Sequence, residues 1–248
     1  MATLITEKIF DPELITEKPI DPKRCVLAFG IPTKKEDFWK YLEHPKKDFA
    51  KKFYKKYSRE SYTRKTNESL VWKEYHNQII FHLDIVKPKI TNFGTEVHDE
   101  LTLSGFGKLF QDNKFDVIIL FSHWKEDAVE FDDGLAKTDA ILEQVPKEFS
   151  GIIDLCVCNP KNLRIQLDLL RPNCIVKFSE QNIKIPFFWL YFYQELFRYL
   201  EQNKTNYLEA VDTILDTFSD MFSQKRRKRK YEEKFKERIQ SLFEKNRV

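Results

Sequence analysis

Four short, continuous apolar runs limit the folds open to this chain more than any other feature of its sequence. They span residues 25–30, 115–121, 151–157 and 174–178. Such runs, without polar alternation, are typical of strands buried on both faces of a sheet. Helical stretches are expected between them, at residues 99–110 and 135–144. Strands that alternate with helices predict an α/β fold with a mainly parallel central sheet and helices on both faces.

Two further segments complete the expected elements. The apolar run at residues 78–83 has the composition of another short strand. From residue 186 onward the pattern is helical almost to the end of the chain. The aromatic run 186–197 is too short to span a membrane and contains Gln194 and Glu195, so it predicts a core helix.

Composition and charge exclude several classes of protein. With 248 residues, 42% of them apolar, the chain can bury a sizeable core. A net charge of +3 creates no global field that would demand a nucleic acid or a membrane as partner. The first twelve residues lack the features of a signal peptide, and no apolar run has the length of a transmembrane segment. A cytoplasmic protein is therefore expected.

The cysteines and histidines do not have the spacing of a disulfide framework or a metal site. The chain has four cysteines, of which Cys156 and Cys158 are separated by one residue. No second cysteine or histidine cluster accompanies this pair, so reduced thiols are expected and no metal ligands are assigned. Phosphate-cradling glycine loops are also absent from a sequence with only 6 glycines. We expect no cofactor.

Three regions are predicted along the chain. Residues 1–23 contain an imperfect repeat whose copies end in Asp-Pro, which favours an extended arm that either meets a partner or is inert. Residues 24–222 hold the predicted α/β domain. Residues 223–248 form a predicted basic helix with an unbroken basic block from Lys225 to Lys230. Such a block binds an anionic surface or is simply a solvated helix face.

The reactive crevice of an open α/β sheet lies beyond the carboxyl ends of its strands. Two polar groups of residues occupy such positions: His123 follows the run at 115–121, and Cys158 follows the run at 151–157. If these strands are neighbours, the two side chains emerge side by side. An ionised thiol is a good acyl-transfer nucleophile, and an imidazole beside it can accept its proton. The alternative is that both are structural residues, because cysteine is often buried.

The region from residue 115 to 218 resembles the CHAT family of caspase-like cysteine peptidases, related to caspases, separase and gingipains. Residues 129–135, Val-Glu-Phe-Asp-Asp-Gly-Leu, are similar to the short hairpin and Asp-Gly that follow the family's histidine. Leu155-Cys156-Val157-Cys158-Asn159 resembles the family's nucleophile segment, and residues 188–196 and 207–211 resemble two later helices. The resemblance implies a caspase-like three-layer sandwich with a helical C-terminus, in which His123 and Cys158 are the catalytic dyad.

Two positions depart from that pattern. The family usually has glycine after the histidine, where a backbone N–H helps to bind the oxyanion, but this chain has Trp124. The segment Asp154-Leu155-Cys156 also resembles the Asp-x-Cys of metacaspases, which would make Cys156 the nucleophile. Cys158 is favoured because it lies nearer the strand end.

An acidic residue in the substrate pocket of related peptidases selects a basic P1 side chain by charge pairing. Asp154, Asp132 and Asp133 are candidates for that role. The alternative for Asp132 and Asp133 is a place in the turn before Gly134.

The resemblance implies a peptidase that cleaves one protein partner in a triggered bacterial antiviral-defence or regulated-death system. A sensor or regulatory subunit supplied in trans is a further partner that the resemblance suggests. A catalytically inactive caspase-like scaffold is the alternative, favoured by Trp124. A nucleic-acid-binding protein is a third hypothesis, which depends on the basic block alone.

Overall fold

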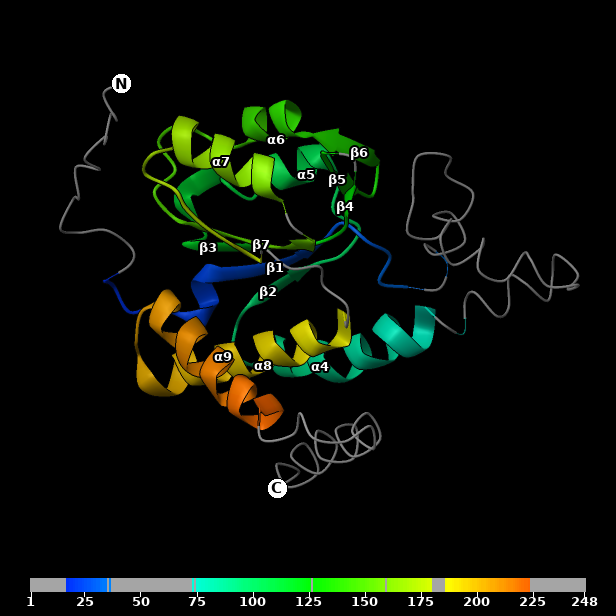
Figure 1. Ribbon diagram of the computed structural model, residues 1–248, viewed down its shortest axis with the longest axis vertical. Helices are drawn as coiled ribbons and strands as arrows, with labels where there is room; N and C mark the ends of the chain where they lie inside the picture. Colours follow the sequence, from blue (N-terminus) through cyan, green and yellow to red (C-terminus); the bar gives the residue numbers. More distant parts are fainter. Residues whose placement is uncertain are drawn as a thin grey trace, which may run out of the picture.

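The computed structural model describes residues 17–34, 36, 73, 75–125, 127–158, 160–179 and 186–223. In them, five parallel strands form one central sheet in the order β2-β1-β3-β7-β8 (Figure 1). The strands are β1 (Cys25–Phe29), β2 (Glu96–His98), β3 (Val117–Phe121), β7 (Ile152–Cys158) and β8 (Ile175–Ser179). The parallel sheet predicted from the four apolar runs is confirmed.

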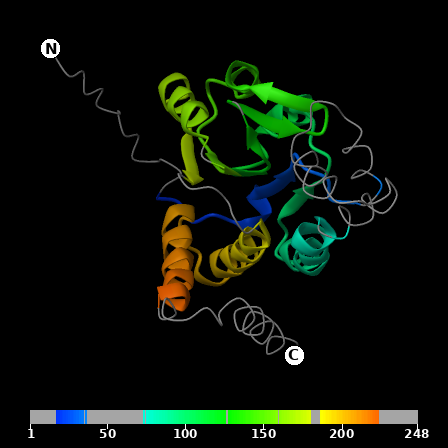
Figure 2. The same cartoon turned by 45° about the vertical axis from the view of Figure 1, so that its right-hand side comes forward.

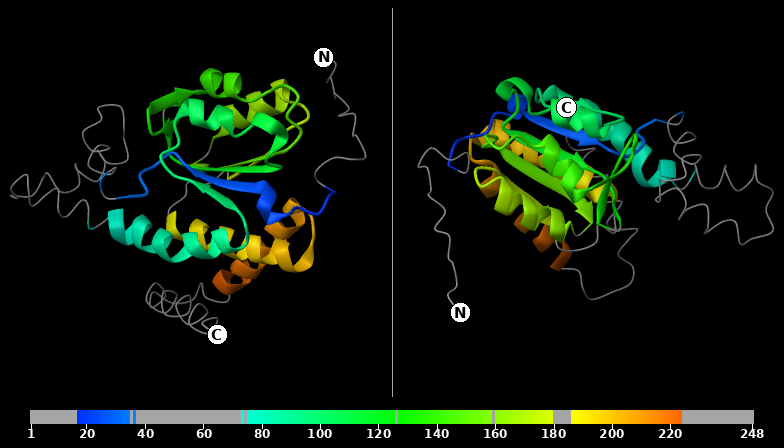
Figure 3. Two further views of the ribbon diagram at one scale, coloured as in Figure 1. Left: turned by 180° about the vertical axis from the view of Figure 1, so that it is seen from behind. Right: turned by 90° about the horizontal axis from the view of Figure 1, so that it is seen from above.

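Helices cover both faces of this sheet. On one face lie α5 (Leu103–Lys108), α6 (Thr138–Gln144) and α7 (Lys161–Leu170). On the other lie α4 (Phe81–Asn92) and the two C-terminal helices α8 (Pro186–Asn203) and α9 (Tyr207–Ser223). Turning the molecule keeps the sheet between these two groups (Figures 2 and 3). The α/β class and the helical C-terminus are as expected.

Alternation along the strands divides the interior into two hydrophobic cores. The first core lies between the sheet and α4, α8 and α9, and it receives Leu27, Ile119 and Cys156 from the strands. The second core lies between the sheet and α5, α6 and α7, and it receives Ala28, Leu120 and Leu155. Because successive side chains of a strand point to opposite faces, each central strand is expected to be apolar at nearly every position. This explains the continuous apolar runs of the sequence.

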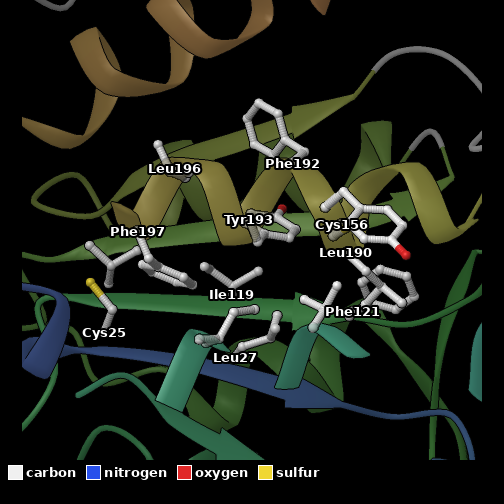
Figure 4. Close-up of a cluster of buried hydrophobic side chains, with 14 of the residues drawn as sticks. Cys25, Leu27, Ile119, Phe121, Cys156, Leu190, Phe192, Tyr193, Leu196 and Phe197 are labelled. Atoms are coloured by element: carbon white, nitrogen blue, oxygen red, sulfur yellow. The ribbon is translucent and has the colours of Figure 1, made fainter. Parts of the chain in front are cut away.

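The first core is rich in aromatic side chains from α8. Figure 4 shows Tyr193 and Phe197 pointing from α8 toward the strands, where Ile119 and Phe121 lie. Phe192, on the same helix, lies near Phe218 of α9, with ring centroids 6.4 Å apart, and its ring centroid is 5.6 Å from the Lys177 ammonium of β8. The predicted core helix at residues 186–197 is therefore confirmed.

A small antiparallel sheet stands beside the carboxyl ends of the central strands (Figure 1). It consists of β4 (Trp124–Lys125), β5 (Ala128–Phe131) and β6 (Gly134–Lys137). A two-residue turn joins β5 to β6, and Gly134 after it has φ of 130°. L-residues with a side chain seldom adopt that conformation, so glycine suits the position.

The prediction of a strand at residues 78–83 is wrong. These residues belong to a π-helical turn, η2 (His76–Ile80), and to the first turn of α4. Ile79, Leu83, Val86 and Ile90 recur at helical spacing and all enter the first core. Packing of this apolar stripe beside α8 outweighs the local strand preference of the isoleucines.

Four smaller features differ from expectation or were not expected. Strand β2 was not predicted, and the helix expected from residue 135 begins at Thr138, because β6 takes the preceding residues. Short 3-10 turns occur at η1 (Pro22–Arg24) and η3 (Gln111–Asn113). Ile20, within the predicted arm, is 1% exposed, and its N–H donates to the carbonyl of Thr205 at 3.0 Å. The end of that segment is thus part of the folded body.

Two predicted features lie outside the described residues: the first repeat copy of the arm and the basic block 225–230. Among the residues that the structure describes, no helix has both the length and the apolar character needed to cross a membrane.

Candidate active site

His123 follows β3 by two residues and Cys158 is the last residue of β7, and these two strands are neighbours in the sheet. β3 and β7 are parallel and hydrogen-bonded, with Phe121 opposite Cys156. The pairing continues past the end of β3, because the N–H of Ser122 donates to the carbonyl of Cys156 at 3.3 Å. His123 and Cys158 each follow these paired residues by two positions. They therefore reach the same carboxyl edge of the sheet on adjacent strands.

Alternation continued from Phe121 and Cys156 predicts that both side chains lie on the side of the first core, although the register of β7 against β8 shifts between Leu155 and Cys158. Phe121 and Cys156 contribute to that core, and side chains two residues apart share a face. His123 and Cys158 are half-buried, whereas the residues before them are buried. The pair thus occupies the boundary between the core and the surface.

The backbone around His123 is held by β5. The carbonyl of His123 accepts from the N–H of Glu130 at 2.9 Å, and the hydroxyl of Ser122 donates to the carbonyl of Glu130. Gly30, at the end of β1, lies against both groups, because a Cβ there would be 2.2 Å from the Glu130 carbonyl oxygen. This close packing of three segments makes the connection after β3 well defined.

The segments that follow His123 and Cys158 are also linked to each other. Asp127 lies in the turn between β4 and β5, with φ of 65°, and Asn162 lies in the first turn of α7. The side-chain amide of Asn162 donates to the Asp127 carboxylate at 2.7 Å. The turn after the histidine strand is thereby tied to the helix after the cysteine strand.

Cys156, the alternative nucleophile, lies in the first core and is 3% exposed. Figure 4 shows it beneath α8, on the side where Tyr193 lies. Burial, together with the nearby negative charge of Asp154, raises the pKa of the Cys156 thiol far above its usual range. A buried thiol of this kind is inert, so the geometry favours Cys158 over Cys156 as a reactive group.

Asp154 is fully buried in the middle of β7, where its charge is neutralised. The ammonium of Lys177 on β8 lies 2.9 Å from both of its oxygens, and the hydroxyl of Tyr207 donates to it at 2.7 Å. The rings of Trp189, Phe192 and Tyr193 surround the ammonium at 5.5 to 5.8 Å. Asp154 is a structural ion-pair partner that joins β7 to β8 through Lys177 and to α9 through Tyr207, and it lies in the middle of β7 instead of at the carboxyl edge.

Asp132 and Asp133 form the turn between β5 and β6. The N–H of Asp132 donates to the carbonyl of Leu101 at 2.8 Å. The carboxylate of Asp133 accepts from the N–H of Leu103 at 3.0 Å, at the first residue of α5. These contacts agree with turn formation and helix capping, the structural alternative considered from the sequence.

Trp124 lies in β4, opposite Val129, and its half-buried ring packs against the second core. Because His123 and Glu130 form a hydrogen-bonded pair, the next pair, Trp124 and Val129, is a non-hydrogen-bonded one. The N–H of Trp124 consequently points away from β5. The Trp124 side chain does not change this direction, so the backbone N–H is directed outward from the small sheet.

Two elements of this region escaped sequence reasoning. Lys177 carried a usable signal, because a lone charge in each of two buried strands requires a partner, and Asp154 is its register partner. Glu130 is 1% exposed although it stands in a short, surface-type hairpin. Its burial depends on segments distant in the sequence, so the local pattern could not have revealed it.

The described residues contain no group of three or more His, Cys, Asp or Glu side chains arranged to hold a metal ion. The chain instead has an imidazole at His123 after β3, a backbone N–H at the next residue, Trp124, and a thiol at Cys158 at the end of the neighbouring β7. Acyl transfer uses groups of these three kinds. Comparison of the chain with protein-family models, with curated proteins and with solved structures finds no match.

Proposed function

We propose that this protein is a cysteine endopeptidase of the caspase-like type, with Cys158 as nucleophile and His123 as general base and then general acid. The observation that carries the proposal is the register of β3 and β7, which brings the residues after both strands to one edge. The Cys158 thiol gives its proton to His123 and its sulfur attacks the peptide carbonyl carbon. His123 then protonates the leaving amine as the C–N bond breaks, and water hydrolyses the thioester.

Several features of the fold support the family resemblance. The hairpin expected after the histidine exists as β5 and β6, and two helices follow the last strand of the sheet. The strand order by itself also occurs in flavodoxin-like folds. The antiparallel strands inserted between β3 and α6 therefore add support that the strand order cannot supply.

A donor for the developing oxyanion is available despite the departure from glycine. The N–H of Trp124 points away from β5, toward the outside of the small sheet. A preorganised backbone donor of this kind stabilises the negative charge of a tetrahedral intermediate. In this proposal Trp124 supplies that donor, while its ring serves only for packing.

The proposed substrate is a protein partner, within a triggered defence or regulated-death system, and a sensor subunit supplied in trans is part of the proposal. A basic P1 preference is not part of it. Asp154 is neutralised by Lys177, and Asp133 is bound to the start of α5. An acidic pocket would have to be formed by other residues.

The test is covalent labelling with a panel of acyloxymethyl-ketone and vinyl-sulfone probes, read by intact mass. Wild type is compared with Cys158→Ala, His123→Ala and the matched control Cys156→Ala, with candidate partner proteins present and absent. Labelling that is lost in Cys158→Ala and His123→Ala but kept in Cys156→Ala supports the dyad. Loss of labelling only in Cys156→Ala would identify Cys156 as the nucleophile. No labelling in any condition would favour the catalytically inactive scaffold.

A further inference from the structure

Glu130 stands directly opposite His123 where β5 pairs with the chain leaving β3. The N–H of Glu130 donates to the carbonyl of His123 at 2.9 Å, and the following pair joins Trp124 to Val129. Directly opposed residues in antiparallel strands have their Cα atoms about 5.5 Å apart and their side chains on one face. The carboxylate of Glu130 and the imidazole of His123 are therefore cross-strand neighbours.

The surroundings of Glu130 agree with this direction. Val129 and Phe131, its neighbours in β5, enter the second core, so Glu130 points to the opposite face of the small sheet. It is 1% exposed. Burial and then the charge of Glu130 raise the pKa of Tyr75, which belongs to the first core and donates to the carbonyl of Pro32 at 2.5 Å.

Alternation along β3 gives an independent placement. It directs Phe121 into the first core and His123 toward the same side of the central sheet. Tyr75, which senses the charge of Glu130, lies on that side as well. Among the described residues, His123, from the end of β3, and Tyr75, from the segment before η2, are titratable groups on the side to which Glu130 points. The backbone pairing with β5 and the alternation along β3 both put Glu130 and His123 on this side.

We propose that Glu130 is a positioning residue for His123, whose carboxylate orients the imidazole and stabilises the imidazolium formed when Cys158 loses its proton. The inference rests on the proposed function for its catalytic meaning. The proton passes from the Cys158 thiol to His123, and Glu130 remains ionised throughout. A nearby carboxylate favours the charged form of an imidazole, so it stabilises the imidazolium.

The experiment follows the titration of His123 by NMR in protein with labelled histidine, using His123→Ala to assign its resonance. A Cys158→Ala background removes the charge of the thiolate. A carboxylate within about 4–6 Å shifts a neighbouring titration by at least about one pH unit. We expect Glu130→Gln to lower the His123 midpoint by about that amount, and Glu130→Asp to restore most of it. The exposed Glu148→Gln is the matched control and should leave the midpoint unchanged.

A second readout uses the cysteine itself. With Cys158 present, Glu130→Gln should slow alkylation of Cys158 at pH 7 by about tenfold, the counterpart of a one-unit shift. The same substitution in a His123→Ala background should have no further effect. An equal slowing in that background, or an unchanged His123 midpoint in Glu130→Gln, would overturn the proposal.

A measurement on protein that keeps Glu130 guards against a Glu130 variant that does not fold. In the Cys158→Ala protein with Glu130 present, the titration midpoint of His123 should lie above the ordinary value of about 6.5, and a lower midpoint contradicts the inference. Because the titration needs no peptidase activity, it can succeed when the labelling test fails. If probe labelling is lost in His123→Ala but unchanged in Glu130→Gln, the proposal of a peptidase stands and the proposed role of Glu130 is wrong.

Discussion

Lys177 and Asp154 form a two-point ion pair inside the protein, with the ammonium 2.9 Å from both carboxylate oxygens. The Asp154 side chain is 0% exposed and that of Lys177 is 14% exposed. The pair joins β7 to β8 and lies beneath the aromatic side chains of α8. It therefore couples the second half of the sheet to the C-terminal helices.

Removing one partner of this pair should destabilise the fold strongly. We expect Asp154→Asn to lower the free energy of unfolding by about 3–5 kcal/mol, because it leaves Lys177 buried without a counter-charge. The double variant Asp154→Leu with Lys177→Met should recover most of that loss. Urea denaturation measures both.

The exposed pair of Lys34 and Glu100 offers a control, since its side chains are 58% and 36% exposed. Glu100→Gln should cost less than about 1 kcal/mol. A loss of similar size for Asp154→Asn would show that the buried pair contributes little.

The cysteines should differ sharply in reactivity. In the native protein at pH 8, iodoacetamide should modify Cys158 alone, because Cys25, Cys156 and Cys174 are buried. Burial raises the pKa values of Cys25 and Cys156 well above their usual range, so few thiolates form there. Peptide mass spectrometry identifies the modified residue, and all four cysteines should react in urea. Equal rates for Cys156 and Cys158 in the native state would contradict this placement.

Gly30 should tolerate no side chain. A Cβ at this position would lie 2.2 Å from the Glu130 carbonyl oxygen and 2.8 Å from the Ser122 hydroxyl. We expect Gly30→Ala to lower the free energy of unfolding by about 1–3 kcal/mol, because the backbone beside His123 must move. Thermal and urea unfolding, with the Cys158 alkylation rate, measure the effect.

Gly107→Ala is the matched control for Gly30. Its Cβ would meet the flexible end of the Gln144 side chain at 2.4 Å, and it lies within α5, where alanine is the better helix former. We expect a change between neutral and about 1 kcal/mol of stabilisation. Equal losses at both glycines would disprove the special packing at Gly30.

Alkaline pH should destabilise the protein through buried tyrosines. Burial raises the pKa values of Tyr75, Tyr193 and Tyr207 well above the usual value of about 10. Because the folded state holds these protons more tightly, their contribution to stability is complete below about pH 10 and is lost as pH rises through the folded-state values. Absorbance at about 295 nm should show delayed ionisation that coincides with loss of the circular dichroism signal. Ionisation of every tyrosine near pH 10 with an unchanged fold would contradict it.

The sequence predicts the centre of this fold better than its margins. The runs that form β1, β3, β7 and β8 are apolar at nearly every position because helices cover both faces of the sheet. Such a pattern can be recognised within a short stretch of sequence. The three-residue β2, with half-buried Glu96 and His98, carries no such pattern. It forms a strand because it hydrogen-bonds to the edge of β1, and this pairing depends on the tertiary structure.

The candidate site was predictable to the same extent. The positions of His123 and Cys158 at one edge follow from the adjacency of β3 and β7, and the apolar runs of the sequence predicted these two strands. The burial of Glu130 does not follow in this way, because it depends on tertiary packing, as the close approach of Gly30 to the Glu130 carbonyl shows. Asp154 shows the converse: its motif suggested a substrate pocket, whereas Lys177 and Tyr207 neutralise and enclose it.

The hydrogen-bonded pairing of β3 with β7 limits how a reaction at this edge can be switched on. Strands in a ladder stay about 4.8 Å apart, and β3 and β7 are hydrogen-bonded neighbours within a five-stranded sheet. If the protein is the triggered peptidase proposed above, its trigger need not draw these two strands together, since the ladder already sets their spacing. Activation would then act on access of the substrate to this edge, where Asn162 at the start of α7 is hydrogen-bonded to the turn at Asp127.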